Sequence, residues 1–109
     1  RRPLLIGIER EWLDIERDRM HHVERRSLEL LADISFSTSD FDMAVQLGRE
    51  LVRIAPYDER AHRNLMHALR ASGNPSGAAK VERDFTERLN ADLGVAPSPT
   101  FFDPLTPAS

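Results

Sequence analysis

The 109-residue sequence contains no cysteine, which excludes disulfides, thiolate chemistry and cysteine-based zinc sites. It has no apolar run near the roughly 18 residues that a membrane-spanning helix needs, and no signal peptide is visible. An excess of positive charge is also missing, because 15 Lys and Arg face 18 Asp and Glu, for a net charge of −3. This balance argues against a domain that binds nucleic acid by itself.

The remaining composition predicts one ordinary globular domain. The hydrophobic content is 40% and the charged content is 30%, as in folded chains and unlike disordered ones. A chain of this length has room for one core and not for two domains. The sequence begins Arg1-Arg2-Pro3 without a methionine, so we expect it to be one domain of a longer protein.

Sparse and regularly spaced Gly and Pro divide the chain into about four predicted helices. The first covers about residues 9–34, where apolar side chains recur at steps of three and four. The second covers 40–55 and is ended by Pro56, because proline disfavours helical geometry in the residue before it. The third covers 59–72 and the fourth 75–93. Such short connections make neighbouring helices antiparallel.

The residues between these helices are suited to capping helix ends. Asp58 is the predicted N-cap of the third helix, and Gly73 is its left-handed C′ residue. Asn74 is the predicted N-cap of the fourth helix, directly before a first-turn proline. Ser39 and Asp42 resemble a weak capping box, which places the N-cap of the second helix at Ser39.

The last fifteen residues, 95–109, hold four prolines, so we expect them to be extended and non-helical. Phe101, Phe102 and Leu105 are too apolar for a free tail. They either fold back over the fourth helix or join a neighbouring copy, and the pattern favours the first arrangement. A stack of about two repeats needs covered ends, so Phe101 and Phe102 are candidate capping residues.

An internal repeat with a period of 34 residues relates the two halves of the chain. The shift places small residues on small ones and large residues on large ones: Ala44 on Ala78, Leu47 on Val81, Leu51 on Phe85, Ala55 on Leu89, Ser27 on Ala61 and Leu31 on Leu65. We therefore predict an all-α fold of tetratricopeptide-like antiparallel helical hairpins. The alternative is a non-repeating four-helix bundle in which the matches are accidental.

Three motifs in the same order resemble the bacterial transcriptional activator domain of regulators of the antibiotic-regulatory-protein (SARP) class. The segment Leu4–Arg19 resembles the family's Leu-x-Gly opening, followed by an acidic–Trp–aliphatic step and Glu-Arg-x-Arg. The segment Ala44–Met66 is similar to its pattern of a helix that ends in an acidic or Pro turn, followed by Glu-x-Ala-His-x-x-Leu-Met. The segment Leu89–Pro99 matches its Leu-Gly-Val-x-Pro-Ser-Pro terminus. Together the motifs cover residues 4–99.

The resemblance implies a cytoplasmic regulatory domain over residues 1–99, with a tail over 100–109. In that family the domain follows a winged helix–turn–helix that binds DNA, which this chain does not contain. The implied partners are that DNA-binding domain, a second copy in a homodimer, or RNA polymerase. The family usually continues into another helix after the position of Pro99, whereas the sequence here cannot. A generic tetratricopeptide adaptor that binds an acidic peptide or protein is the alternative function.

No motif predicts catalysis, a metal site or a cofactor, so we expect no enzyme activity. A helical metal pair needs an i, i+4 spacing, whereas His21 and His22 are adjacent and His62 and His67 are five apart. We therefore expect surface histidines. The segment 73–77 is glycine-rich but lacks the lysine and the length of a phosphate loop.

Two features are candidate interaction sites. On the third helix, Arg60, Arg63, His67 and Arg70 fall within an arc of about 80°, and we name them the arginine row. In a concave groove, this row would bind acidic side chains, a phosphopeptide or a C-terminal carboxylate. The alternative is a solvated face compensated by nearby acids. Trp12 is predicted to anchor the start of the first helix by packing, or else to be a partner hot spot.

Overall fold

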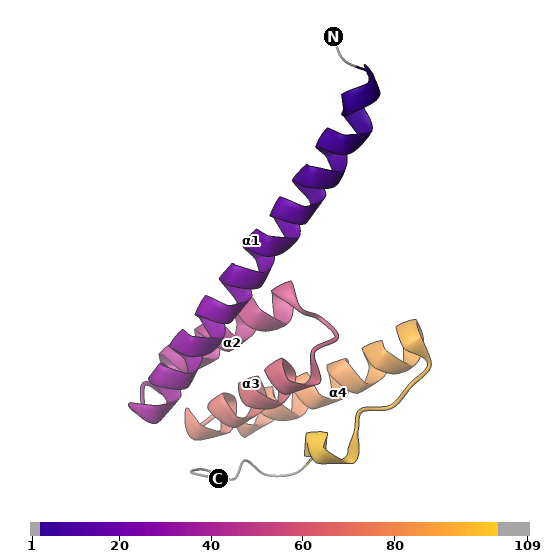
Figure 1. The fold of residues 1–109 in the computed structure, drawn as a ribbon. Helices are drawn as coiled ribbons and strands as arrows, with labels where there is room; N and C mark the ends of the chain where they lie inside the picture. The colour runs from indigo at the N-terminus through magenta and orange to yellow at the C-terminus, as the bar shows by residue number, and fades with distance from the viewer. Residues whose placement is uncertain (1–2, 103–109) are drawn as a thin grey trace.

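The structure, a computed structural model, describes the backbone of residues 3–102 and the side chains of residues 10–101. Over these residues it contains four α-helices, one short 3-10 helix and no strand (Figure 1). The elements are α1 (Pro3–Ser37), α2 (Phe41–Ile54), α3 (Glu59–Ala71), α4 (Pro75–Leu93) and η1 (Pro99–Phe102). The predicted all-α class is confirmed.

The helices are arranged as two consecutive hairpins. The helix α1 packs on α2, α2 packs on α3, and α3 packs on both α4 and η1. Figure 1 shows α1 as the longest element, with its N-terminal half projecting away from the other helices. This arrangement fits the tetratricopeptide-like hairpins that the 34-residue period predicts.

The helix α1 and its exit turn differ from the prediction. It begins at Pro3, before the expected start, because the fixed φ of proline suits a first helical turn. It ends with Ser39 in the left-handed region at φ 64°, and the backbone N–H of Asp40 donates to the carbonyl O of Ser35 at 2.8 Å. The N-cap of α2 is therefore Asp40, which accepts from the N–H of Met43, and the predicted Ser39 N-cap is wrong.

The other predicted caps are confirmed. The carboxylate of Asp58 accepts hydrogen bonds from two backbone N–H groups in the first turn of α3, at 3.0 and 3.3 Å. Gly73 ends α3 with φ 90°, where a side chain would be strained. Asn74 accepts from the N–H of Gly77 at 2.9 Å and caps α4. Side chains at helix ends depend on local backbone geometry, which is why the sequence identifies most of them.

The core is built around α3, which is covered by α2, α4 and η1. The main buried cluster contains Leu65, Met66, Leu69, Ala78, Phe85, Leu89 and Phe101. Because helices and η1 cover α3 on several sides, it buries more of its circumference than the single apolar stripe seen in the sequence. Two polar residues of α3, His62 and His67, are buried along with the apolar ones.

The C-terminal segment folds back onto α3 and α4. Residues Pro99–Phe102 form the 3-10 helix η1 where the sequence predicts extended chain. Phe101 is 1% exposed, and its ring centroid lies 5.0 Å from that of Phe85. Adding the 34-residue period to the bounds of α3 gives residues 93–105. The segment η1 therefore lies at the sequence position where a further repeat would have its first helix. The Phe102 side chain and Leu105 lie outside the described residues.

Gly48 sets the separation of α2 and α3, and this gives a first test of the packing. A Cβ at Gly48 would lie 3.0 Å from Leu65 Cδ1 and 3.4 Å from the Leu65 backbone. We expect Gly48→Val to lower the free energy of unfolding by about 1–3 kcal/mol through overpacking. Arg49→Val is the control at the adjacent exposed position and should change it by about 0.5 kcal/mol or less. Equal effects in urea unfolding would contradict a close contact at Gly48.

Phe101 gives a second test, because it lies beyond the predicted domain boundary at residue 99 but inside the core. We expect Phe101→Ala to lower the free energy of unfolding by about 3–5 kcal/mol, as for other buried aromatic truncations. Val95→Ala removes a half-exposed side chain from the same segment and should have a much smaller effect. If the two variants have the same midpoint in thermal unfolding, η1 does not cover the end of the core.

Candidate functional site

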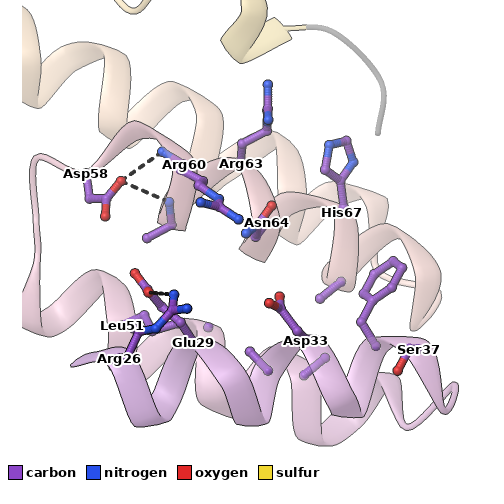
Figure 2. Close-up of a pocket in the computed structure, with 16 residues that line it drawn as sticks. Arg26, Glu29, Asp33, Ser37, Leu51, Asp58, Arg60, Arg63, Asn64 and His67 are labelled. Carbon is purple, nitrogen blue, oxygen red and sulfur yellow. Dashed lines mark hydrogen bonds and ion pairs between the residues drawn. The ribbon is translucent and has the colours of Figure 1, made fainter. Parts of the chain in front are cut away.

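A groove of about 420 Å³ lies between α1 and α3, with α2 at its base (Figure 2). Its base is apolar and consists mostly of small side chains: Ala32, Ala44, Gly48, Leu51, Ala61 and Ala68. These small residues make the groove deep, because their side chains project little from the helices that carry them. The hollow thus arises from the same residues that let the helices pack closely.

The wall formed by α1 carries charged side chains. Arg26 Nη1 lies 3.5 Å from Glu29 Oε1, so these two residues form an ion pair along the helix. Asp33 lies farther along the same wall, and Figure 2 shows its carboxylate pointing across the groove. Within the described residues, Asp33 forms no ion pair or side-chain hydrogen bond. Its charge is therefore available to a ligand.

The wall formed by α3 carries Arg60 and Asn64. Arg60 is exposed, and its guanidinium has no hydrogen-bond partner among residues 10–101. Figure 2 shows Arg60 and Asn64 near the opening, across from Asp33. The groove thus combines an apolar base with unpaired polar groups of opposite charge on its two walls.

An ion pair joins α1 to the start of α3 at one end of the groove. The carboxylate of Asp58, which caps α3, also pairs with the guanidinium of Arg25. Arg25 Nε lies 3.4 Å from Glu29 Oε2, so the pair extends into the α1 wall. The sequence pattern predicts Asp58 only as a cap and gives no sign of Arg25. The two residues are 33 positions apart, and no local pattern links them.

The structure does not bring the arginine row together as one open face. Arg60, Arg63 and His67 all line the groove, but Arg63 also donates from Nη1 to the carbonyl O of Thr100 at 2.9 Å. Figure 2 shows Arg63 and His67 pointing away from α1. Arg70 is exposed but does not line the groove. The row is divided because η1 packs on the side of α3 that the sequence analysis assigned to a groove or to solvent.

A second contact that the sequence analysis missed holds the C-terminal segment on α3. The backbone N–H of Ser98 donates to Glu59 Oε1 at 2.8 Å, and the Ser98 hydroxyl donates to Glu59 Oε2. Glu59 belongs to the middle motif that resembles the activator family, and Ser98 belongs to the C-terminal one. Membership in these motifs was the only sign in the sequence that the two residues matter. Their contact with each other is seen only in the folded chain.

The expectation of surface histidines is wrong for His62 and His67, each of which is 7% exposed. The ring of His62 stacks on Phe85 with centroids 4.1 Å apart, and its Nδ1 lies 2.8 Å from the Asp58 carbonyl O. Burial lowers the pKa of His62 below its usual range. Packing of α2, α4 and η1 on α3 explains the correction, because a helical pattern with one apolar stripe does not predict cover on several sides.

His67 is also buried, but unlike His62 it has a buried ring nitrogen without a hydrogen bond. Its Nε2 is inaccessible to solvent and has no hydrogen-bond partner among the described residues, and the same holds for Arg63 Nε. Burial lowers the pKa of His67, and the positive charges of Arg70 and Arg63 lower it further. The neutral imidazole is therefore the form that the folded chain favours.

Trp12 does not anchor α1 against the rest of the chain, as the favoured prediction required. It is 58% exposed. The helix α1 has 35 residues and spans about 52 Å, whereas α2 has 14 residues and spans about 21 Å. The start of α1 therefore lies beyond the reach of its neighbour. The role of Trp12 as a partner hot spot stays a prediction.

Other kinds of site receive no support from the part of the chain that the structure describes. It contains no group of three or more His, Cys, Asp or Glu side chains that could hold a metal ion. None of the described helices has the length and apolar character required to cross a membrane. The groove is the feature that combines depth with unpaired polar groups.

The comparisons with known proteins give one match. A family model described as "Bacterial transcriptional activator domain" matches residues 1–103. The match includes all four helices and η1. Neither the curated proteins nor the solved structures include a match to this chain.

The two buried histidines predict that acid destabilises the fold. Because the pKa of each is lowered on folding, the unfolded chain binds more protons once the pH falls below about 6.5. The stabilisation from neutral histidines is complete above that pH and is lost as the pH falls through it toward the lower pKa of the folded state. We expect the free energy of unfolding to decrease between about pH 7.5 and pH 5.5.

Urea unfolding at several pH values measures this dependence, and substitutions assign it. His67→Gln should flatten the curve, because it removes a group that takes up a proton on unfolding. His21→Gln, at an exposed position of α1, is the matched control and should leave the slope unchanged. An equal slope in all three proteins would show that His67 does not contribute.

Proposed function

Because the chain belongs to the bacterial transcriptional activator domain family, we propose that it is the regulatory protein–protein interaction module of a transcriptional activator. The sequence motifs bound the module at residues 1–99, and we extend it to include η1, because Phe101 lies in the core. It works without covalent chemistry, by presenting a shaped surface to a partner protein. Since bacterial transcription takes place in the cytoplasm, the protein acts there.

The groove between α1 and α3 is the observation that carries this proposal. Its apolar base is largely buried already, since Ala44, Leu51, Ala61 and Ala68 are each 7% exposed or less. The hollow above that base and the polar groups on its walls are what a protein segment would bind. The partner segment would belong to the DNA-binding domain of the same activator, to a second copy or to RNA polymerase. DNA itself is contacted only through the winged domain.

Arg60 and Asp33 give the groove a preference for the orientation of that segment. Arg60 would bind an acidic side chain through charge-assisted hydrogen bonds, and Asp33 would bind a donor on the opposite wall. Arg63 is already bonded to Thr100 in the tail, so Arg60 is the member of the arginine row best placed for a partner. The groove therefore fits a segment with an apolar face and an acidic side chain.

Charge reversal at Arg60 tests this function in the complete activator. We expect Arg60→Glu to reduce activated transcription with purified RNA polymerase by about three- to tenfold, while binding to promoter DNA is retained. The loss should be larger at low salt, because screening weakens exposed charge pairs. A Glu in the first turn of α3 suits the helix dipole, so the substitution is compatible with the fold.

Arg70→Glu is the matched control, since it makes the same charge change on the same helix outside the groove. It should leave activated transcription close to that of the unmodified activator. If Arg60→Glu has no effect, or if both variants reduce transcription equally, the groove is not the partner site. Co-purification of the activator with RNA polymerase, with and without residues 1–109, then shows whether the module makes any contact.

A further inference from the structure

A stripe of apolar side chains follows the outer face of α1. Eight of the twelve exposed large hydrophobic residues in the described chain belong to this one helix. At 100° per residue, seven of them fall within about 100° of each other. These are Trp12, Leu13, Met20, Val23, Leu30, Leu31 and Ile34, and we call them the outer stripe.

The outer stripe lies on the face of α1 opposite the groove. The helix turns Arg25, Glu29 and Ala32 toward α2 and α3, and these residues are less exposed than the stripe. The 34-residue period makes Leu31 equivalent to Leu65, yet Leu31 is 50% exposed and Leu65 is 2% exposed. In the second hairpin Leu65 packs against Gly48 of α2, whereas Leu31 in the first hairpin stays half-exposed.

The spacing of the stripe is that of a helix that packs along another helix. Positions 13, 16, 20, 23, 27, 30 and 34 follow alternating steps of three and four, as the a and d positions of three heptads do. Leu13, Met20, Val23, Leu30 and Ile34 occupy five of these positions. The remaining two positions, 16 and 27, hold the polar residues Glu16 and Ser27. A partner helix must place polar groups opposite them.

We propose that the outer stripe is a homodimer interface, in which α1 packs antiparallel against α1 of a second copy. The two polar positions are the first support. An antiparallel register that places Leu13 opposite the second copy's Leu30 also places Met20 opposite Val23 and Glu16 opposite Ser27. A serine hydroxyl can donate to a carboxylate, so the polar positions satisfy each other in this register.

The charges along one edge of the stripe are complementary in the same register. Arg17 lies next to the second copy's Glu24, and twofold symmetry repeats this pair on the other half of the interface. On the opposite edge, Arg19 approaches Arg26. Each of these arginines has an acidic neighbour within its own helix, Glu16 at 3.9 Å and Glu29 at 3.5 Å. The like charges are therefore partly neutralised.

The size of the stripe fits a stable dimer. From Trp12 to Ile34 it is about 33 Å long. Seven half-exposed large side chains offer on the order of 700 Å² per copy, near the roughly 800 Å² per partner of a standard interface. Figure 1 shows that the N-terminal half of α1 projects beyond α2–α4, which leaves room for a second helix alongside it.

A symmetric pair is favoured over a head-to-tail stack of copies. A head-to-tail stack would join the outer face of α1 to the open side of α3 and α4. That side is occupied by η1, with Phe101 in the core. The inference deepens the proposed function, because it names a second copy as one partner, but it uses the face of α1 opposite the groove.

Sedimentation equilibrium of the 109-residue chain tests the dimer. We expect a mass of twice 12.4 kDa at micromolar concentrations. Met20→Lys places two charges at the centre of the interface and should raise the dissociation constant more than tenfold. Ile15→Lys is the matched control, since Ile15 is equally exposed on the same helix but lies about 60° outside the stripe. It should leave the dimer intact.

Charge exchange and crosslinking then test the register. Arg17→Glu and Glu24→Arg should each weaken the dimer, and the double exchange should restore it, which general loss of folding would not do. The chain has no native cysteine, so a mixture of Leu13→Cys and Leu30→Cys chains should form the mixed disulfide. A parallel pair would instead link two Leu13→Cys chains to each other.

A monomer at all concentrations would overturn the proposal, as would a dimer unaffected by Met20→Lys or a crosslink of the parallel type. These outcomes are separable from failure of the proposed function. Arg60→Glu, in the groove, should leave the mass of the dimer unchanged. Loss of activated transcription with an intact dimer supports the groove alone, whereas a dimer without an Arg60 effect supports the outer stripe alone.

Discussion

The packing of α3 between α2 and α4 is the constraint on which the rest of the structure depends. Small residues allow it, since Ala44 and Gly48 in α2 and Ala78 in α4 let the helix backbones approach closely. Once α3 is enclosed in this way, its polar residues are enclosed too. His62 and His67 are buried for this reason, and the low polarity around them favours their neutral forms.

The groove and the outer stripe both follow from how α1 is held. It packs on α2, and the Arg25–Asp58 ion pair ties it to the start of α3. This leaves a hollow with a small-residue base on one face of α1 and an uncovered apolar stripe on the other. The helix α1 thereby contributes to two surfaces with different chemistry, the mixed-charge groove and the apolar outer stripe.

The predictions that succeeded depend on neighbours in the sequence. The four helices, the Asp58 and Asn74 caps and the 34-residue period all reflect contacts within a few residues or a simple spacing. The predictions that failed depend on what lies next to a residue in space. Trp12 was expected to be packed, but its side chain is 58% exposed. Arg63 was expected in an open row, but it bonds to Thr100, 37 residues away.

The sequence by itself determined the all-α class, most helix ends and the repeat, because helix propensity, capping and hydrophobic spacing are local properties. It also carried the family motifs, which the match over residues 1–103 confirms. Only the tertiary structure decided which polar side chains are enclosed and which remain free for a partner. The reason is geometric: a helix pattern tells which residues share a face, whereas the cover on that face comes from elements distant in the chain, such as η1 over α3.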